Sequence, residues 1–166
     1  MSSQAKTVAS ERESLDFQLE SGWRPFTLCG KHLSFREHCI SRLCQADCNH
    51  WGPAVYKWEG LIKEGEHAGQ TGVLIGETGD LRSRIKQYVS GTQESGNKFW
   101  RERFLTKGEI YLYVLESAIL RSKWSSFESK LSDLSGANVR LVLEQLLVFR
   151  EAARGDGTRW IVNRKL

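Results

Sequence analysis

The sequence predicts an α+β fold in which helices flank a small three-stranded antiparallel sheet, preceded by an N-terminal extension that is mostly helical. Two short apolar runs, residues 54–58 and 72–76, read as the strands of a hairpin, and residues 110–115 give the strongest strand signal in the chain. Apolar residues at helical spacing dominate elsewhere. A chain of 166 residues with 40% hydrophobic and 27% charged content can bury one core.

The predicted extension covers residues 1–52. Residues 1–14 are rich in Ser, Lys and Glu and are expected to be flexible, because they hold too little apolar surface to offset the entropy of ordering. Scattered apolar positions follow, the later ones at helical spacing. A turn-like segment at residues 49–53 then separates the extension from a domain that spans residues 53–166.

Four helical segments are expected in this domain. The first begins at Asp80, a suitable N-cap, and ends before Gly91. Residues 97–105 form the second, ahead of the third strand. A polar helix is expected at residues 123–134 and a strongly apolar one at residues 139–153.

Charge and cysteine content limit the class of protein. A formal net charge of +4 favours polyanionic partners, although many ordinary proteins carry a similar excess. No run approaches the roughly 18 apolar residues of a membrane span, and the polar start lacks a signal-peptide core, so we expect a cytoplasmic protein that does not contact membranes. The four cysteines are therefore expected to be reduced thiols.

Two charged residues occupy unusual positions. Glu144 lies in the apolar helix, with hydrophobic residues one turn away, where an unpaired carboxylate is costly to desolvate. An ion pair with Arg140 or with Arg84 would satisfy it. Arg84 lies at the edge of the apolar face of its own helix, either with its stem on the core and its head in water, or aimed at a bound anion.

The order of these features resembles the GIY-YIG nuclease superfamily. Two short strands that each contain a small motif are followed by a helix with an arginine, a third strand and a late glutamate. The residues that carry the resemblance are Ala54, Val55 and Tyr56 in the first motif, Leu74, Ile75 and Gly76 in the second, then Arg84, Asn97, Glu144 and Asn163.

The resemblance implies a metal-dependent DNA endonuclease. In that reading Glu144 holds one Mg²⁺ or Mn²⁺ ion, Arg84 contacts the phosphate, and Tyr56 orients or deprotonates the attacking water. Tyr88, one turn after Arg84, would bind the phosphate or Tyr56, or simply pack as a half-buried aromatic residue. Gly76 and Asn163 would support the site.

Basic residues in and beside these motifs are the expected nucleic-acid contacts, with double-stranded DNA as the partner and a homodimer as one way to cut both strands. They are Lys57, Arg82, Lys86, Lys98, Arg101 and Arg103. The last three alternate with aromatic residues, as in a phosphate-binding surface or an ordinary amphipathic helix.

Two departures from the family pattern leave alternatives open. Leu74 stands where relatives carry a second tyrosine, so a catalytically inactive nucleic-acid-binding module is the rival function. The connector at residues 59–70 is long, and is either a DNA-contacting loop or an insertion. A zinc-stabilised interaction protein is the third candidate, although the spacing of the cysteines and histidines between Cys29 and His50 argues against zinc.

Overall fold

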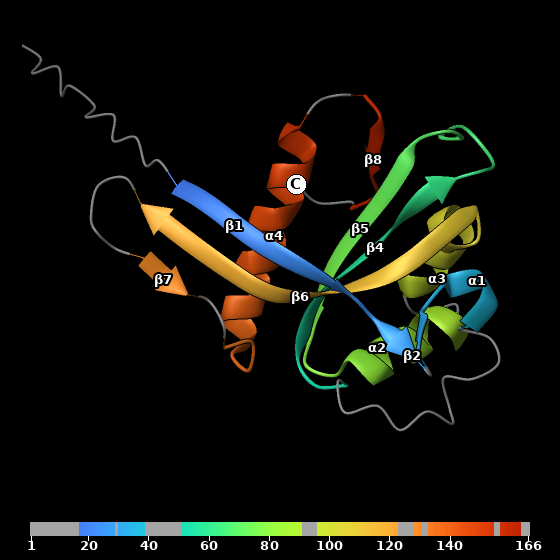
Figure 1. Cartoon of the computed structure of the whole chain (residues 1–166). Helices are drawn as coiled ribbons and strands as arrows, with labels where there is room; N and C mark the ends of the chain where they lie inside the picture. Colours follow the sequence, from blue (N-terminus) through green and yellow to red (C-terminus); the bar gives the residue numbers. More distant parts are fainter. Residues whose placement is uncertain are drawn as a thin grey trace, which may run out of the picture.

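A computed structural model describes residues 17–28, 30–38, 51–90, 96–122, 128–130, 133–154 and 157–163. Its main feature is a six-stranded mixed sheet with the strand order β1-β6-β4-β5-β8, in which β7 also pairs with β6 (Figure 1). The strands are β1 Phe17–Pro25, β4 Ala54–Ile62, β5 Thr71–Thr78, β6 Gly108–Ser122, β7 Glu128–Lys130 and β8 Arg159–Ile161. A separate two-stranded sheet is formed by β2 Thr27–Leu28 and β3 Lys31–His32.

The helices are α1 Phe35–His38, α2 Leu81–Ser90, α3 Gly96–Trp100 and α4 Ala137–Ala153, with a π-helical turn, η1, at Arg101–Leu105. Asp80 caps α2 as expected, because its Oδ1 accepts a hydrogen bond of 3.0 Å from the backbone N–H of Ser83. No helix among the described residues is both long and apolar enough to cross a membrane.

The predicted fold class is wrong in the size of the sheet. The three expected strands are present as β4, β5 and β6, but they form the centre of a larger sheet, with β1 added beyond β6 and β8 added beyond β5. Both added strands are stabilised by pairing with residues distant in the sequence, and local composition does not reveal such partners.

The extension is also not mostly helical. Its described part consists of β1, β2 and β3 and only one four-residue helix, α1. The expected polar helix at residues 123–134 is likewise wrong, because residues 128–130 form β7. The predicted flexible start at residues 1–14 and the first two residues of the turn predicted at residues 49–53 lie outside the described residues.

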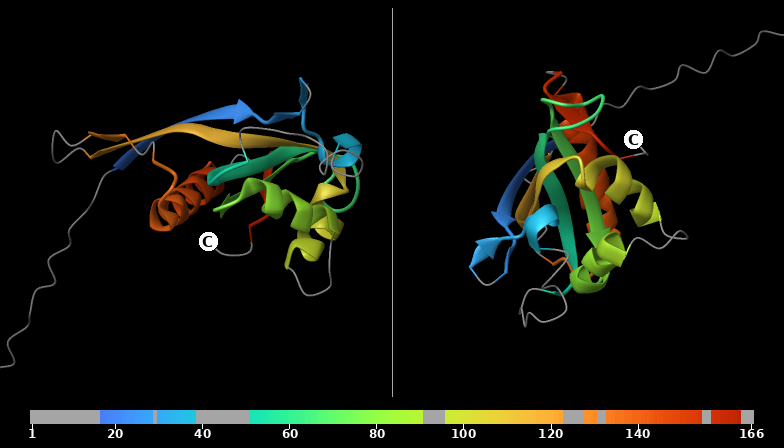
Figure 2. Two further views of the ribbon diagram at one scale, coloured as in Figure 1. Left: turned by 90° about the horizontal axis from the view of Figure 1, so that it is seen from below. Right: turned by 90° about the vertical axis from the view of Figure 1, so that its right-hand side faces the viewer.

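The long strand β6 explains the curled shape of the sheet. Its first part pairs with β4, and its later part pairs antiparallel with β1, where the register shifts between Gly22 and Trp23. A bulge of this kind bends a strand and increases its twist. Figure 2 shows β1 and β6 continuing as an arm that passes over α4.

Two hydrophobic cores lie on opposite faces of the central strands. Successive side chains of a strand point to opposite faces, so Tyr56 and Trp58 face the core shared with α2, whereas Val55 faces the core beneath α4. In the same way, Leu74 and Ile75 belong to different cores. Helices α2 and α4 therefore flank the same strands from two sides.

Candidate functional site

A cavity of about 330 Å³ lies where these two helices approach β5. Strand β8 pairs with β5 only at residues 71–73. Beyond that point the side chain of Asn163 takes over, since its Nδ2 donates to the carbonyl of Ile75 at 2.8 Å and its Oδ1 accepts from the N–H of Ile75 at 3.1 Å. The side chain of Asn163 thus satisfies the backbone N–H and carbonyl of Ile75. No further residue of β8 is needed to pair with Ile75, so the cavity stays uncovered at this point.

The cavity brings together the six residues predicted to be catalytic, to bind the metal or to support the site. They come from β4, β5, α2, α4 and the segment after β8, and are Tyr56, Gly76, Arg84, Tyr88, Glu144 and Asn163. Leu74, Ile75, Glu77, Asn97, Trp100 and Gln145 complete the lining.

A pair of tyrosines forms the inner wall. The hydroxyls of Tyr56 and Tyr88 share a hydrogen bond of 2.9 Å, and the rings meet edge to face at 6.4 Å. Both side chains are almost fully buried. Burial is the main cause that raises the pKa of both hydroxyls, well above the usual value for Tyr56, while the positive charge of Arg84 opposes the rise. Both hydroxyls therefore keep their protons at neutral pH.

Gly76 makes room for this pair. It lies opposite Tyr56 in the β4–β5 ladder, and a Cβ atom at Gly76 would lie 2.4 Å from the hydroxyl oxygen of Tyr56. Any side chain would displace the tyrosine ring, so a glycine is required by packing here.

Glu144 is the most perturbed acid of the site. Burial, followed by the negative charge of Glu77, raises the pKa of Glu144 to about 7, and Arg84 lowers it only in part. Among the described residues, Glu144 has no ion-pair partner within 4.0 Å. The Glu144 carboxylate thus lies near the negative charge of Glu77, and the positive charge of Arg84 only partly offsets the resulting repulsion.

The ion pair between Glu144 and Arg140 that their spacing allows is not formed. Arg140 instead donates from Nε to Oε2 of Glu77 at 2.9 Å and from a terminal nitrogen to the carbonyls of Leu134 and Ser135, each at 2.8 Å. Only 7% of the Arg140 side chain is exposed, so this arrangement fixes Glu77 next to Glu144.

The basic residues expected to contact nucleic acid are not gathered at the cavity. Lys57 is buried on the α4 side of the sheet, where it pairs with Glu59 at 3.0 Å, so it is placed away from any phosphate at the site. Arg101 donates to the carbonyl of Val89 at 2.6 Å, and Lys98 pairs with Glu102 at 3.7 Å.

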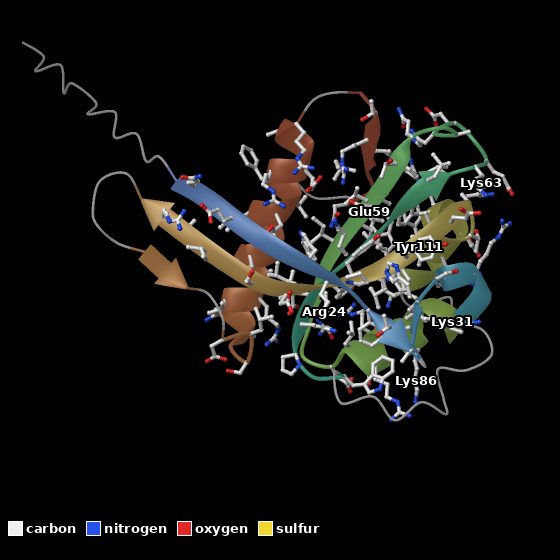
Figure 3. The ribbon with its side chains drawn as sticks, viewed as in Figure 1. Arg24, Lys31, Glu59, Lys63, Lys86 and Tyr111 are labelled. Carbon is white, nitrogen blue, oxygen red and sulfur yellow. The ribbon has the colours of Figure 1, made fainter. Side chains whose placement is uncertain are left out.

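The other three predicted contacts lie nearer the surface. Arg82 is half-buried beside the ring of Trp51. Lys86 is exposed on the outer side of α2 (Figure 3). Arg103 is exposed on η1, next to the rings of Phe99 and Trp160.

Glu77 and Gln145 are the site residues that sequence reasoning missed. Each directly follows a predicted residue, Gly76 and Glu144 respectively. A carboxylate immediately after the second strand motif was an available signal for Glu77, whereas Gln145 carries no signal of its own.

The donor set fits a hard divalent cation. Mg²⁺ keeps several water ligands and is commonly bound by only one or two carboxylates, as Glu144 and the neighbouring Glu77 would supply. The raised pKa of Glu144 agrees with this fit, because a bound cation would offset both the burial of the carboxylate and its repulsion by Glu77. Within the described part of the chain, no three His, Cys, Asp or Glu side chains gather into a metal cluster.

The zinc alternative rests almost entirely on residues that are not described. Cys29, Cys39, Cys44, Cys48 and His50 all lie outside the described residues. The described His32 donates from Nε2 to the carbonyl of Leu112 at 2.8 Å and packs between two tyrosine rings.

Comparison of the chain with protein-family models, with curated proteins and with solved structures gives no match. The function must therefore be inferred from the site itself.

Proposed function

We propose that this chain is a metal-dependent nuclease that hydrolyses DNA phosphodiester bonds in the cavity beside β5. The observation that carries the proposal is the convergence of Tyr56, Arg84 and Glu144 from one strand and two helices on a single cavity. These are the residues on which the resemblance to GIY-YIG nucleases rests, and we include a distant membership of that superfamily in the proposal.

Each of these residues has a defined task in the proposed reaction. Arg84 binds the non-bridging phosphate oxygens, for which its planar fork is suited. Glu144 would hold Mg²⁺ or Mn²⁺, and such an ion would supply positive charge for the oxygen that leaves. Because burial keeps the proton on Tyr56, its hydroxyl first acts as a hydrogen-bonding group that orients the attacking water.

Cleavage of supercoiled and linear DNA with Mg²⁺ or Mn²⁺ tests this proposal. The variants Arg84→Ala and Glu144→Gln should each lose at least about 100-fold in rate. The matched controls are Arg24→Ala and Glu116→Gln, which alter the two partners of a surface ion pair outside both cavities. Wild-type protein that never nicks DNA, or site variants that cleave like the controls, would disprove the proposal.

A nucleic-acid-binding module without catalysis is the second candidate. Leu74 favours it, because a hydrocarbon side chain that can neither hydrogen-bond nor accept a proton lines the cavity where relatives carry a tyrosine. Binding of duplex DNA without cleavage, unaffected by Glu144→Gln, would support this candidate over the nuclease.

The proposed substrate is double-stranded DNA. One cavity can cut one strand at a time, so a second copy of the chain would permit both strands to be cut in one binding event. Sedimentation of the protein with and without a duplex measures whether such a homodimer forms.

A further inference from the structure

A second cavity, of about 230 Å³, lies at the turn between β4 and β5. The cavity is lined by residues of this turn, of η1 and of β8, and by Lys107, which follows η1. The residues that matter are Glu66 and His67 of the turn, Arg103 and Lys107, and Trp160. None of these side chains lines the first cavity.

The wall of this cavity is a rigid aromatic stack. The ring of His67 lies on Trp160 with centroids 3.9 Å apart and planes tilted by 14°. Gln70 fixes the histidine through a hydrogen bond of 3.0 Å to Nδ1, and it also donates to the carbonyl of Gly157 at 3.2 Å. Phe104 meets the Trp160 ring edge to face at 5.9 Å. A flat ligand would therefore find a preformed surface at little entropic cost.

Two cations at this stack, Arg103 and Lys107, form no ion pair with any of the residues that the structure describes. The guanidinium carbon of Arg103 lies 6.0 Å from the centroid of Trp160 and 5.4 Å from that of Phe99. In the described segments, neither Arg103 nor Lys107 makes a side-chain hydrogen bond or an ion pair. Glu64, also in the lining, pairs with Arg36 at 3.5 Å, which leaves Glu66 as the opposing charge.

One helical segment connects this cavity with the first one. Trp100, the last residue of α3, lines the first cavity, and Arg103, three residues later in η1, lines the second. Three residues of helix rise by about 5 Å. Isolated π-helical turns such as η1 recur at functional sites, where they change the direction of side chains. A polymer bound in the first cavity could follow this segment to the second.

We propose that the second cavity is a subsite for an unpaired base of the substrate nucleic acid. The base stacks against the His67–Trp160 wall, and Arg103 and Lys107 bind the adjoining phosphate. Aromatic stacking combined with unpaired cations is the arrangement by which proteins bind single strands with little dependence on sequence. The inference rests on the proposed function for its assignment of nucleic acid as the ligand, and adds a preference for a substrate with a single-stranded segment.

Fluorescence polarisation in EDTA tests the subsite without any cleavage. The probes are a blunt labelled duplex and the same duplex with a single-stranded tail. Wild-type protein should bind the tailed probe about tenfold more tightly, and His67→Ala and Arg103→Ala should each remove most of that preference. His67→Phe should keep it, because a phenyl ring preserves the stack. Glu66→Gln should strengthen binding of the tailed probe.

Lys31→Ala is the matched control for loss of one positive charge, since Lys31 is exposed on β3, away from the second cavity (Figure 3). It should leave the preference for the tailed probe unchanged. Equal binding of both probes by wild-type protein, or equal losses in Arg103→Ala and Lys31→Ala, overturns the subsite. The binding assay contains EDTA and needs no metal, so a failed cleavage assay would not contradict the subsite. Conversely, a loss of the preference for the tailed probe would contradict the subsite but not the proposed nuclease activity.

Discussion

Replacing Glu144 by glutamine should stabilise the protein at neutral and alkaline pH. The carboxylate of Glu144 is partly buried beside Glu77, and burial followed by this like charge raises its pKa from 4.5 to about 7. Glutamine has nearly the same shape and no charge, so Glu144→Gln removes the repulsion and keeps the packing. A residue retained at such a cost to stability is typical of a functional site.

The magnitude and the pH window follow from the raised pKa. Below about pH 4.5 the carboxyl group is protonated in both the folded and the unfolded chain, so it costs nothing. As the pH rises from 4.5 to about 7, the unfolded chain loses this proton first, and the free energy of unfolding falls. The full shift corresponds to about 3 kcal/mol, which partial exposure to solvent reduces to about 1–2 kcal/mol.

Urea unfolding at pH 5 and pH 8, followed by tryptophan fluorescence, measures the effect. Glu144→Gln should be about 1–2 kcal/mol more stable than wild type at pH 8 and nearly equal at pH 5. Mg²⁺ should stabilise wild type at pH 8 but not the variant, because a ligand of the folded state raises stability by mass action. Glu116→Gln, on an exposed strand position, should show neither effect. A Glu144→Gln variant that is less stable than wild type at pH 8 would refute the reasoning.

Three other changes give separate tests of the site. Arg84→Lys keeps the charge but loses the planar fork, so DNA cleavage with Mn²⁺ should fall about 100-fold, whereas an unchanged rate would mean that only charge matters. Gly76→Ala places a Cβ atom 2.4 Å from the Tyr56 hydroxyl and should lower the free energy of unfolding by about 1–3 kcal/mol. Gly96→Ala, with no atom within 4 Å of the new Cβ, is its control in the same urea titration. Tyr88→Phe leaves the buried Tyr56 hydroxyl without its partner and should cost about 1–3 kcal/mol, part of which a second Tyr56→Phe change restores.

The central strands and two helices could be predicted because their signals are local. The apolar runs at residues 54–58, 72–76 and 110–115 all lie within β4, β5 and β6, and the capped helix at Asp80 is α2. The apolar helix at residues 139–153 lies within α4. Propensity and periodicity act over a few residues, so elements of this kind can be recognised from sequence alone.

The outer strands could not be predicted in this way. Strand β1 contains a glycine and ends in a proline, and it is stabilised by nine residue pairs with β6, about 100 positions later in the chain. Strand β8 is only three residues long and pairs in parallel with β5. In both strands the backbone conformation depends on pairing with a strand that is distant in the sequence. The local sequence allows an extended conformation but does not by itself favour it.

Several residues that line the first cavity could be singled out from the sequence, whereas the electrostatics of the cavity could not be predicted. The awkward positions of Arg84 and Glu144 in their helices marked both as unusual, and both line the cavity. The sequence could not show that Arg140 pairs with Glu77 rather than with Glu144, since the choice depends on how α4 packs against β5. That choice leaves Glu144 without a partner among the described residues, and so determines its raised pKa.

The hydrogen bond between Tyr56 and Tyr88 bears most directly on the choice between catalysis and binding alone. Leu74 brings no hydroxyl into the cavity, so Tyr88 supplies the second one from α2 instead of from β5. Burial, Tyr88 and Glu144 raise the pKa of Tyr56 and only the positive charge of Arg84 lowers it, so the Tyr56 hydroxyl keeps its proton. Burial is the main cause that raises the pKa of both tyrosines and Glu144 is a minor one, so neutralising Glu144 would remove only a small part of the rise. The two protonated hydroxyls can hydrogen-bond a water molecule or a phosphate oxygen, and this task does not require a hydroxyl at Leu74.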